Sequence, residues 1–456
     1  MKIRVAIAIV AIGLVLGMSG ALQAQFGRAR DPGPRTKDVP QEPVPLPGLS
    51  DAEQAMFEAG LDEFSEEETV PEGIGPRFNF VSCKGCHTQP VVGGSSPPVN
   101  PLFRIPREDD LQFTRNRIPS FITPDGPVRE ARFKLKSDGT RDGGVHALFV
   151  ITGHPDAAGC GIAQEDFELQ VRNRNIIFRI PTPVFGAGLI EQIPDSAIVA
   201  NVQAQSSQKS ALGIRGRANR INVSGTANRN GNDGTIARFG WKAQNKSLTL
   251  FSGEAYNVEM GITNELFQSE RDETTNCQFA SVPNDVVPAV DQISAVAHFA
   301  NFQRFLAPLA PSRETPGGAL SIARGRARFM EVGCALCHTP SLQTSKRSTV
   351  EALSDKQANL FSDLALHYMG AGLADDVFQG EADGAEFRTA PLWGLGPRVF
   401  FLHDGRTKDL AEAIQAHRSF PTSKYGPSEA NGVIDRYNSL PRESDRQDIL
   451  NFLRSL

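Results

Sequence analysis

Cys83-Lys84-Gly85-Cys86-His87 and Cys334-Ala335-Leu336-Cys337-His338 are two copies of one motif, C-x-x-C-H. This spacing is the attachment signature of c-type haem, in which both thiols bond to the porphyrin and the histidine ligates the iron. A structural zinc site needs four ligands within one small module, and a redox dithiol has no need of the histidine. The sequence therefore predicts two covalently bound c-type haems. Their cysteines are Cys83, Cys86, Cys334 and Cys337, and their proximal iron ligands are His87 and His338.

The N-terminus has the pattern of an export signal. Lys2 and Arg4 precede an apolar stretch, residues 5–16, that is too short to span a bilayer comfortably, and small residues follow it. We expect residues 1–24 to be a cleaved signal peptide and the mature chain to be soluble in the periplasm or another extracytoplasmic compartment. An uncleaved anchor is the alternative, and it would be the only membrane contact.

The remaining cysteines form an even pair. The chain has six cysteines, and the two motifs use four of them, which leaves Cys160 and Cys277. In an oxidising compartment such a pair favours a disulfide. The alternative is two unpaired buried thiols.

Length and charge limit the organisation of the chain. With 456 residues, it is too long for one hydrophobic core. We expect a mobile, proline-rich leader at residues 25–48, an N-terminal haem domain at 49–310 and a C-terminal haem domain at 314–456. The formal net charge of −5, with mixed signs, argues against nucleic acid as a partner.

The apolar pattern predicts a mainly α protein. Helices are expected from Asp51 through Leu61, over residues 291–306 and over residues 442–456. A β-hairpin is expected between residues 128 and 152, and the polar residues 201–235 read as a long surface excursion. The fold class is therefore two cytochrome c-like haem domains, the first enlarged by loop and β-hairpin insertions.

The chain also repeats itself. FRIPTPVFGAG, from Phe178, is matched by FRTAPLWGLG, from Phe387, and FGWKAQNKSL (239–248) aligns with FLHDGRTKDL (401–410). Each pair follows its own C-x-x-C-H motif in the same order. The simplest explanation is two related haem domains, although chance could account for the shorter match.

Several segments resemble the bacterial di-haem cytochrome c peroxidase superfamily, and most closely its branch of thiol oxidoreductase-like di-haem c-type oxidoreductases. They are GPRFNFVSCKGCHTQPVVGGSSP (75–97), DLALHYMGAGLAD (363–375), FRTAPLWGLG and FLHDGR. The resemblance covers nearly everything from about Asp51 onward. It implies that one haem takes up peroxide or oxygen while the other passes electrons to it. Other members modify methylamine dehydrogenase or oxidise rubber, so the fold does not fix the substrate.

The residue opposite each proximal histidine decides what each haem does. Met369 lies in a glycine-flanked loop after His338, and the resemblance favours it as the distal ligand of the C-terminal haem. His367 is its competitor, and a haem without either ligand is the third alternative. Met330, shortly before Cys334, is expected to be a packing residue.

The N-terminal haem then becomes the candidate reactive site. The stretch from Trp241 to Met260 resembles the peroxidase segment that carries a tryptophan between the haems and, further on, a Glu-Met pair. The resemblance implies Glu259 as the catalytic acid–base residue, with Glu254 second, and Trp241 as the redox bridge. The interval is shorter than in the peroxidases, and Phe251 stands where a distal glutamine is expected, which makes the pocket more apolar. The alternative is a surface Glu259 and a core Trp241.

Other groups are assigned more simply. Arg388 or Arg406 is expected to pair with a haem propionate, and His403 to have a structural role. Four histidines are not expected to ligate iron: His146, His154, His298 and His417. Related peroxidases hold a calcium ion between their domains, but no acidic loop here indicates a site for one.

These observations predict an enzyme of the cytochrome c peroxidase type. A small redox donor, a cytochrome or a cupredoxin, would deliver electrons to the His338 haem, and hydrogen peroxide would be reduced at the His87 haem. Two alternatives stay open: an oxygenase or oxidase acting on an organic or protein substrate, and a non-enzymatic two-haem electron carrier.

Overall fold

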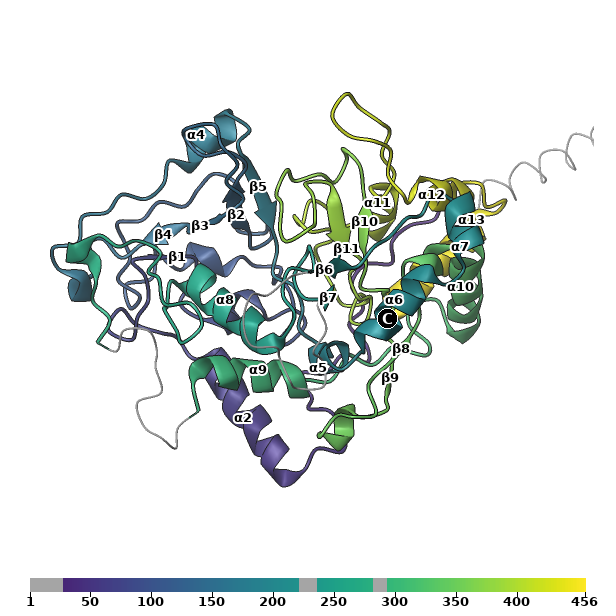
Figure 1. The fold of residues 1–456 in the computed structure, drawn as a ribbon, viewed down its shortest axis with the longest axis horizontal. Helices are drawn as coiled ribbons and strands as arrows, with labels where there is room; N and C mark the ends of the chain where they lie inside the picture. The colour runs from purple at the N-terminus through teal and green to yellow at the C-terminus, as the bar shows by residue number, and fades with distance from the viewer. Residues whose placement is uncertain (1–27, 221–235, 282–292) are drawn as a thin grey trace, which may run out of the picture.

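The computed structural model describes residues 28–220, 236–281 and 293–456, so the expected signal peptide lies outside the described residues. In this part of the chain helices contribute more residues than strands, as the sequence predicts (Figure 1). None of the described helices is long and apolar enough to cross a membrane. The α-helices are α2 (Asp51–Ser65), α3 (Cys83–Cys86), α4 (Phe167–Arg172), α5 (Ala187–Glu191), α6 (Asp195–Gln203), α7 (Ser206–Ala211), α8 (Leu248–Met260), α9 (Ala295–Phe305), α10 (Ala319–Val332), α11 (Leu410–Gln415), α12 (Asn431–Asn438) and α13 (Glu443–Ser455).

The strands form small antiparallel sheets. The largest has β2 (Glu130–Phe133) between β3 (Val145–His146) and β5 (Ile176–Arg179), with Ala131 opposite His146, which confirms the predicted hairpin. The other sheets have two strands each: β1 (Arg77–Phe78) with β4 (Phe149–Val150), β6 (Asn219–Arg220) with β7 (Ile236–Ala237), β8 (Leu342–Gln343) with β9 (Gln357–Ala358), and β10 (Leu366–Tyr368) with β11 (Glu386–Arg388).

The core of the first half forms where α2 crosses α9. Ser50 and Glu53 form a capping box that starts α2 where the sequence predicts it. The backbones approach so closely that a Cβ on Gly60 would lie 2.4 Å from the carbonyl oxygen of His298. Phe64 of α2 packs on Phe302 of α9, with ring centroids 4.8 Å apart.

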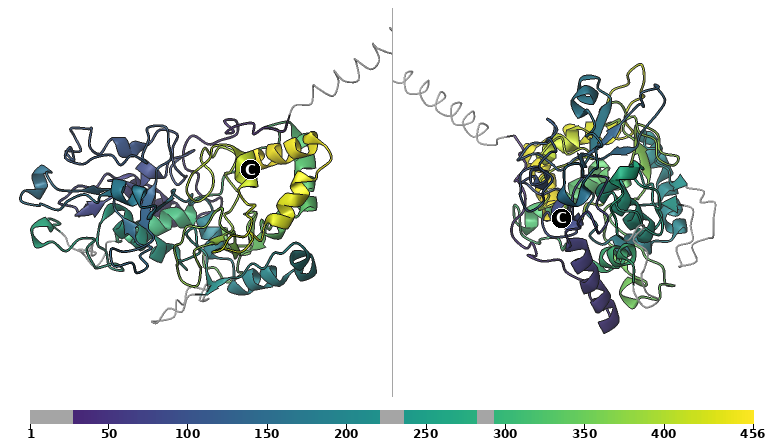
Figure 2. Two further views of the ribbon diagram at one scale, coloured as in Figure 1. Left: turned by 90° about the horizontal axis from the view of Figure 1, so that it is seen from above. Right: turned by 90° about the vertical axis from the view of Figure 1, so that its left-hand side faces the viewer.

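The second half repeats this packing with α10 and α13. A Cβ on Gly325 would lie 1.9 Å from the carbonyl oxygen of Asp448, and Phe329 packs on Phe452 with centroids 5.4 Å apart. Figure 2 shows α13, in yellow, beside α10, in green, at one end of the molecule. Both helix pairs are therefore the same design, with a glycine at the crossing.

Backbone contacts follow the internal repeat as well. The Gly186 N–H donates to the Leu306 carbonyl at 3.1 Å, and the Gly394 N–H donates to the Leu456 carbonyl at 3.0 Å. Two further bonds cross between the repeats: Ile180 N–H to the His403 carbonyl at 2.8 Å, and Arg388 N–H to the Trp241 carbonyl at 2.9 Å. Backbone hydrogen bonds therefore join the two repeats in both directions, and the Trp241 carbonyl accepts one of these bonds.

Two segments differ from the expectations. The predicted surface excursion begins with helix, because α6 and α7 extend to Ala211, and residues 221–235 lie outside the described residues. The described part of the leader is packed rather than mobile. The Arg454 side chain is fully buried and forms an ion pair with Asp31 at 2.6 Å, and a buried guanidinium needs such a partner.

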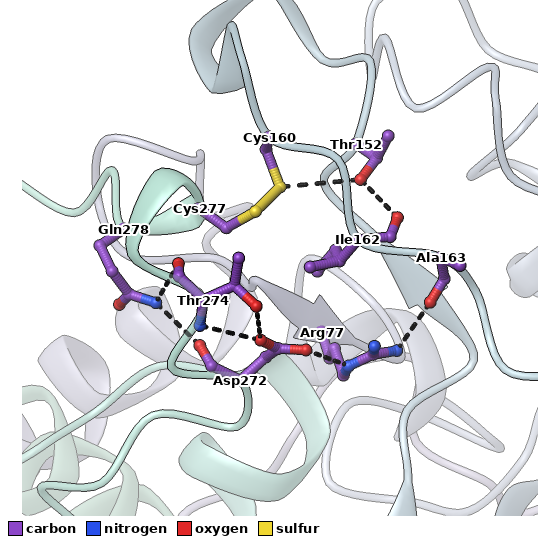
Figure 3. Close-up of a disulfide and its surroundings, with 9 residues drawn as sticks. All are labelled: Arg77, Thr152, Cys160, Ile162, Ala163, Asp272, Thr274, Cys277 and Gln278. Atoms are coloured by element: carbon purple, nitrogen blue, oxygen red, sulfur yellow. Dashed lines mark hydrogen bonds and ion pairs between the residues drawn. A yellow bond between two sulfur atoms is a disulfide. The ribbon is translucent and has the colours of Figure 1, made fainter.

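A disulfide joins Cys160 and Cys277, the pairing that their even count favours (Figure 3). The S–S distance is 2.10 Å and the Cα atoms are 4.7 Å apart. Close to it, Arg77 of β1 forms an ion pair with Asp272 at 2.8 Å. The disulfide ties the segment after β4 to the segment after α8, and the ion pair ties β1 to that same segment after α8.

Candidate functional site

The first C-x-x-C-H motif forms a single helical turn, α3, that ends at His87. The His87 N–H donates to the Cys83 carbonyl at 3.0 Å, and its Nδ1 lies 3.2 Å from the Gly94 carbonyl oxygen. This contact assigns the Nδ1 proton, so Nε2 is the nitrogen left for a metal. Burial lowers the pKa of His87 to about 4, which keeps the ring neutral, as an iron ligand must be.

A cavity opens beside this motif, and we call it the first cavity. Cys83, Cys86 and His87 line it. Three residues that the sequence analysis singled out also line it: Trp241, Phe251 and Glu259. The rest of the wall includes the aromatic residues Phe64, Phe80, Tyr256 and Phe299 and the arginines Arg129, Arg132 and Arg179.

Glu259 is the carboxyl group of α8 that reaches this cavity. Burial is the main cause that raises its pKa to about 8, with smaller contributions from Glu130 and Glu254. Glu254, the second choice, instead accepts a hydrogen bond from Asn245 and does not line the cavity. A carboxyl that titrates near neutral pH at a cavity wall suits proton transfer.

The second motif has the same internal contacts. The His338 N–H donates to the Cys334 carbonyl at 2.9 Å, and Nδ1 lies 3.0 Å from the Phe361 carbonyl oxygen. Burial again lowers the pKa of this histidine to about 4. A second cavity is lined by Cys334, Cys337 and His338, so each motif has a cavity of its own.

Met369 and His367 both line the second cavity, but their side chains differ in their hydrogen-bond partners. The His367 ring lies between two carboxylates, with Nε2 3.0 Å from Asp363 and Nδ1 2.9 Å from Glu429. Both ring nitrogens are therefore engaged by the protein. Met369 has no such tie on its sulfur among the contacts of the described residues, which favours it over His367. Met330 is half-exposed on α10 and does not line the cavity.

Trp241 stands between the two cavities. Among the described residues it alone lines both. Its Nε1–H donates to the Ile180 carbonyl at 2.9 Å, and the Arg398 guanidinium lies 5.8 Å from the ring centroid. The ring is thus held in place rather than free to turn.

Two arginines, the half-buried Arg388 and the buried Arg398, show that the second cavity suits an anionic group. Arg388 and Arg398 line it, and burial lowers the pKa of each to about 10. Arg388 is bonded only to carbonyl oxygens, and Nε and Nη2 of Arg398 have no hydrogen-bond partner among the described residues. A buried cation requires a counter-charge, and haem propionates would supply one. Of the two arginines expected as propionate partners, the structure favours Arg388, because Arg406 pairs with Asp404 at 2.7 Å and does not line the cavity.

Comparison with known families identifies the chain. Residues 138–456 match the model of the family described as "Di-haem oxidoreductase, putative peroxidase". The chain belongs to this family. The matched region holds the second motif, Trp241 and Glu259, whereas the first motif lies outside it. Family membership implies two haems, and their covalent attachment stays a prediction.

The di-haem oxidoreductase has limited similarity to solved structures. Hydrazine synthase of Kuenenia stuttgartiensis matches with a TM-score of 0.24 over 45% of this chain and 60% of that chain. A MauG-like protein associated with microbial copper homeostasis matches with a TM-score of 0.28 over 47% of this chain and 68% of that chain. The di-haem peroxidase BthA of Burkholderia thailandensis matches with a TM-score of 0.28 over 48% of this chain and 65% of that chain, and the sequence identity is 15% in all three matches. The matches thus span about 60% to 68% of those chains. A comparison with curated protein sequences found no match.

Some site residues of the di-haem oxidoreductase carried no sequence signal. Arg398 follows the FRTAPLWGLG repeat, but Ile190 occupies the corresponding position of the first repeat, so the repeat does not indicate it. His403, by contrast, lies in the FLHDGR segment of the repeat and is expected from the sequence to have a structural role; it stacks on Phe387 with centroids 4.3 Å apart and also lines the second cavity. Within the described residues, the metal-type cluster is Cys337, Asp363 and His367. Only Asp363 among them offers the oxygen ligand that calcium prefers, so this cluster indicates no calcium site, and calcium binding stays open.

Proposed function

We propose that this di-haem oxidoreductase is an exported c-type peroxidase that reduces hydrogen peroxide at the His87 haem. The observation that supports it most is the pair of cavities meeting at Trp241, each beside its own C-x-x-C-H motif. The two cavities offer different functional groups to a haem. Glu259 offers a proton-transfer group in the first, while Met369 offers a thioether ligand in the second. Electrons would therefore run from the His338 haem toward the His87 haem.

Haem, when bound, would supply the iron redox chemistry. Glu259 would take a proton from the incoming peroxide and return it to the departing oxygen. Each peroxide consumes two electrons and two protons and yields two waters. The aromatic wall around Phe251 would keep bulk water from competing, and Arg388 and Arg398 would neutralise the propionates in the second cavity.

The proposal includes two cytochrome c-like haem domains, residues 49–310 and 314–456, and a small redox protein as donor. The matched helix crossings at Gly60 and Gly325 support two related units. The Cys160–Cys277 disulfide supports an extracytoplasmic location.

Electron paramagnetic resonance on the protein, made in cells competent for cytochrome maturation, tests this proposal. We expect two covalently bound haems, with a high-spin signal at the His87 site in the half-reduced protein and peroxide turnover with a reduced cytochrome. Met369→Leu should lower the reduction potential of the His338 haem, whereas Met330→Leu should not. Two haems that stay low-spin in every redox state, with no turnover, would mean a two-haem electron carrier instead.

An oxygenase or oxidase for an organic substrate is the second candidate. The aromatic lining of the first cavity, with Phe251 among its residues, favours it. Oxygen consumption that depends on an added apolar substrate, in a protein inactive with peroxide and a reduced donor, would support this function over the first.

A further inference from the structure

The first cavity has a built connection to an acidic surface. Tyr256 lines the cavity and is only 3% exposed. Its hydroxyl donates to Oε1 of Glu68 at 2.7 Å. Glu68 lies in the loop between α2 and β1, where its N–H donates to the Val81 carbonyl at 2.8 Å. The pair therefore runs from the cavity wall toward the outside of the protein.

Outside Glu68 the chain is acidic and open to solvent. Four carboxylates near it in sequence are exposed: Asp62, Glu66, Glu67 and Glu72. Glu68 itself is half-buried between them and Tyr256. Exposed carboxylates exchange protons with water rapidly, so they can load a deeper carboxyl group.

At its inner end the pair reaches the proposed reaction site. Tyr256 and Glu259 are one turn apart on α8 and line the same cavity. Burial raises the pKa of the Cys83 thiol, and the charges of Glu259 and Glu68 add to this effect. Both carboxyl groups therefore act on one residue of the cavity wall.

We propose that Glu68 and Tyr256 form the proton-entry route to the first cavity. This inference rests on the proposed function, since peroxide reduction consumes protons that a largely apolar cavity cannot supply. Once Glu259 has given up its proton and Glu68 is protonated, the Tyr256 hydroxyl would turn from Glu68 toward Glu259, give its proton to that carboxylate, and take the proton of Glu68 on Oη. Glu68 would then regain a proton from solvent. The two protons used for each peroxide come from water, and the two electrons come from the reduced donor.

The titration of Glu68 agrees with this route. Burial is the main cause that raises its pKa to about 7, Tyr256 opposes the shift, and Glu66, Glu63 and Glu72 add to it. The groups that act on Glu68 are thus Tyr256 on α8, Glu63 on α2, and Glu66 and Glu72 on its own loop. A carboxyl with such a pKa is both loaded and unloaded at neutral pH.

Glu68→Gln and Tyr256→Phe test the route in the holoprotein, with Glu58→Gln, at an exposed carboxylate of α2 outside the route, as the control for lost surface charge. We expect peroxide turnover to fall about tenfold or more in both test variants, with the pH dependence near 7 removed in Glu68→Gln and kept in Glu58→Gln. Added formate, a small proton carrier, should restore turnover in Glu68→Gln, which a merely structural defect would not allow. Wild-type rates and an unchanged pH profile in both variants would overturn the proposal.

An infrared pH titration of the resting protein separates this proposal from the proposed function. Burial also raises the pKa of Glu259 to about 8 and that of Glu270 to about 7, so the readout is the difference spectrum between wild type and variant. The share of one carboxyl group in the band near neutral pH should be lost in Glu68→Gln and shifted in Tyr256→Phe. If the wild-type protein does not reduce peroxide, the proposed function fails, and the difference spectrum then decides the route. A band of unchanged amplitude in Glu68→Gln overturns it, and loss of one carboxyl group's share supports proton exchange through the pair.

Discussion

Two glutamates on one helix differ in their surroundings. Glu259 faces the first cavity, while Glu254 is tied to Asn245 away from it. Glu259→Gln removes the proton-transfer group with little change in shape, so peroxide turnover should fall about 10²- to 10⁴-fold. Steady-state kinetics with a reduced cytochrome donor measures this loss. Glu254→Gln is the matched control on the same helix, and an equal loss in that variant would contradict the assignment.

The ionisation of Glu259 gives a pH dependence with a definite sign. Its pKa is raised to about 8, so the group carries its proton at neutral pH. Ionised Glu259 is the form that takes a proton from peroxide, and kcat/KM should therefore rise as the pH rises through about 8. In Glu259→Gln this rise should be absent, and an unchanged rise would assign it to another group.

At the scale of secondary-structure elements, the close crossings of helix pairs determine stability. At the crossing of α10 with α13, a Cβ on Gly325 would meet the Asp448 carbonyl oxygen at 1.9 Å. Gly325→Ala must push the helices apart, and we expect a loss of about 1–3 kcal/mol in the free energy of unfolding. Urea denaturation measures it. Leu320→Ala, on an exposed position of α10, should change stability by about 0.5 kcal/mol or less.

The elements also show how far sequence reasoning reaches. Apolar spacing predicts α2, α9 and α13, and the motif spacing indicates His87 and His338, because these signals are local. Arg398 and the Tyr256–Glu68 pair have no local signal, since their contacts join residues far apart in the chain. The packed leader is missed for the same reason. A proline-rich segment is typical of mobile chain, and only the ion pair between its Asp31 and the buried Arg454 shows that it is packed.

At the scale of the whole molecule, one buried ion pair ties the N-terminal segment to the last helix. Asp31 accepts two bonds from Arg454, and Arg454 also donates to the Gly396 and Arg398 carbonyls. Asp31→Asn would leave a buried guanidinium without its counter-charge, at a cost of about 3–5 kcal/mol in the free energy of unfolding. Asp355→Asn is the control, because the Lys346–Asp355 pair is exposed and is worth about 1 kcal/mol at most.

The same ion pair predicts how stability depends on pH. Burial alone would raise the pKa of Asp31, but the hydrogen bonds from Arg454 and the Leu410 N–H outweigh it and lower the pKa. The stabilisation is therefore complete above the unfolded pKa of about 3.9 and is lost as the pH falls through the lower folded value. Denaturation of wild type and Asp31→Asn should converge in acid. A gap that stays constant to low pH would contradict this account of the pair.

Trp241 is the residue through which we propose that electrons pass between the two haems. Since it alone of the described residues lines both cavities, Trp241→Phe should slow electron transfer between the haems while leaving both haems in place. We expect a decrease of about tenfold or more, about 1.4 kcal/mol in the barrier. Stopped-flow absorbance, following oxidation of the His338 haem after peroxide is mixed with the reduced protein, measures the rate. Trp393→Phe is the comparison with the same chemical change: that buried tryptophan lines neither of the two cavities but lines a smaller one shared with Trp241, so the rate should fall less in this variant. Equal rates in the wild type and Trp241→Phe would mean that electrons cross by another path.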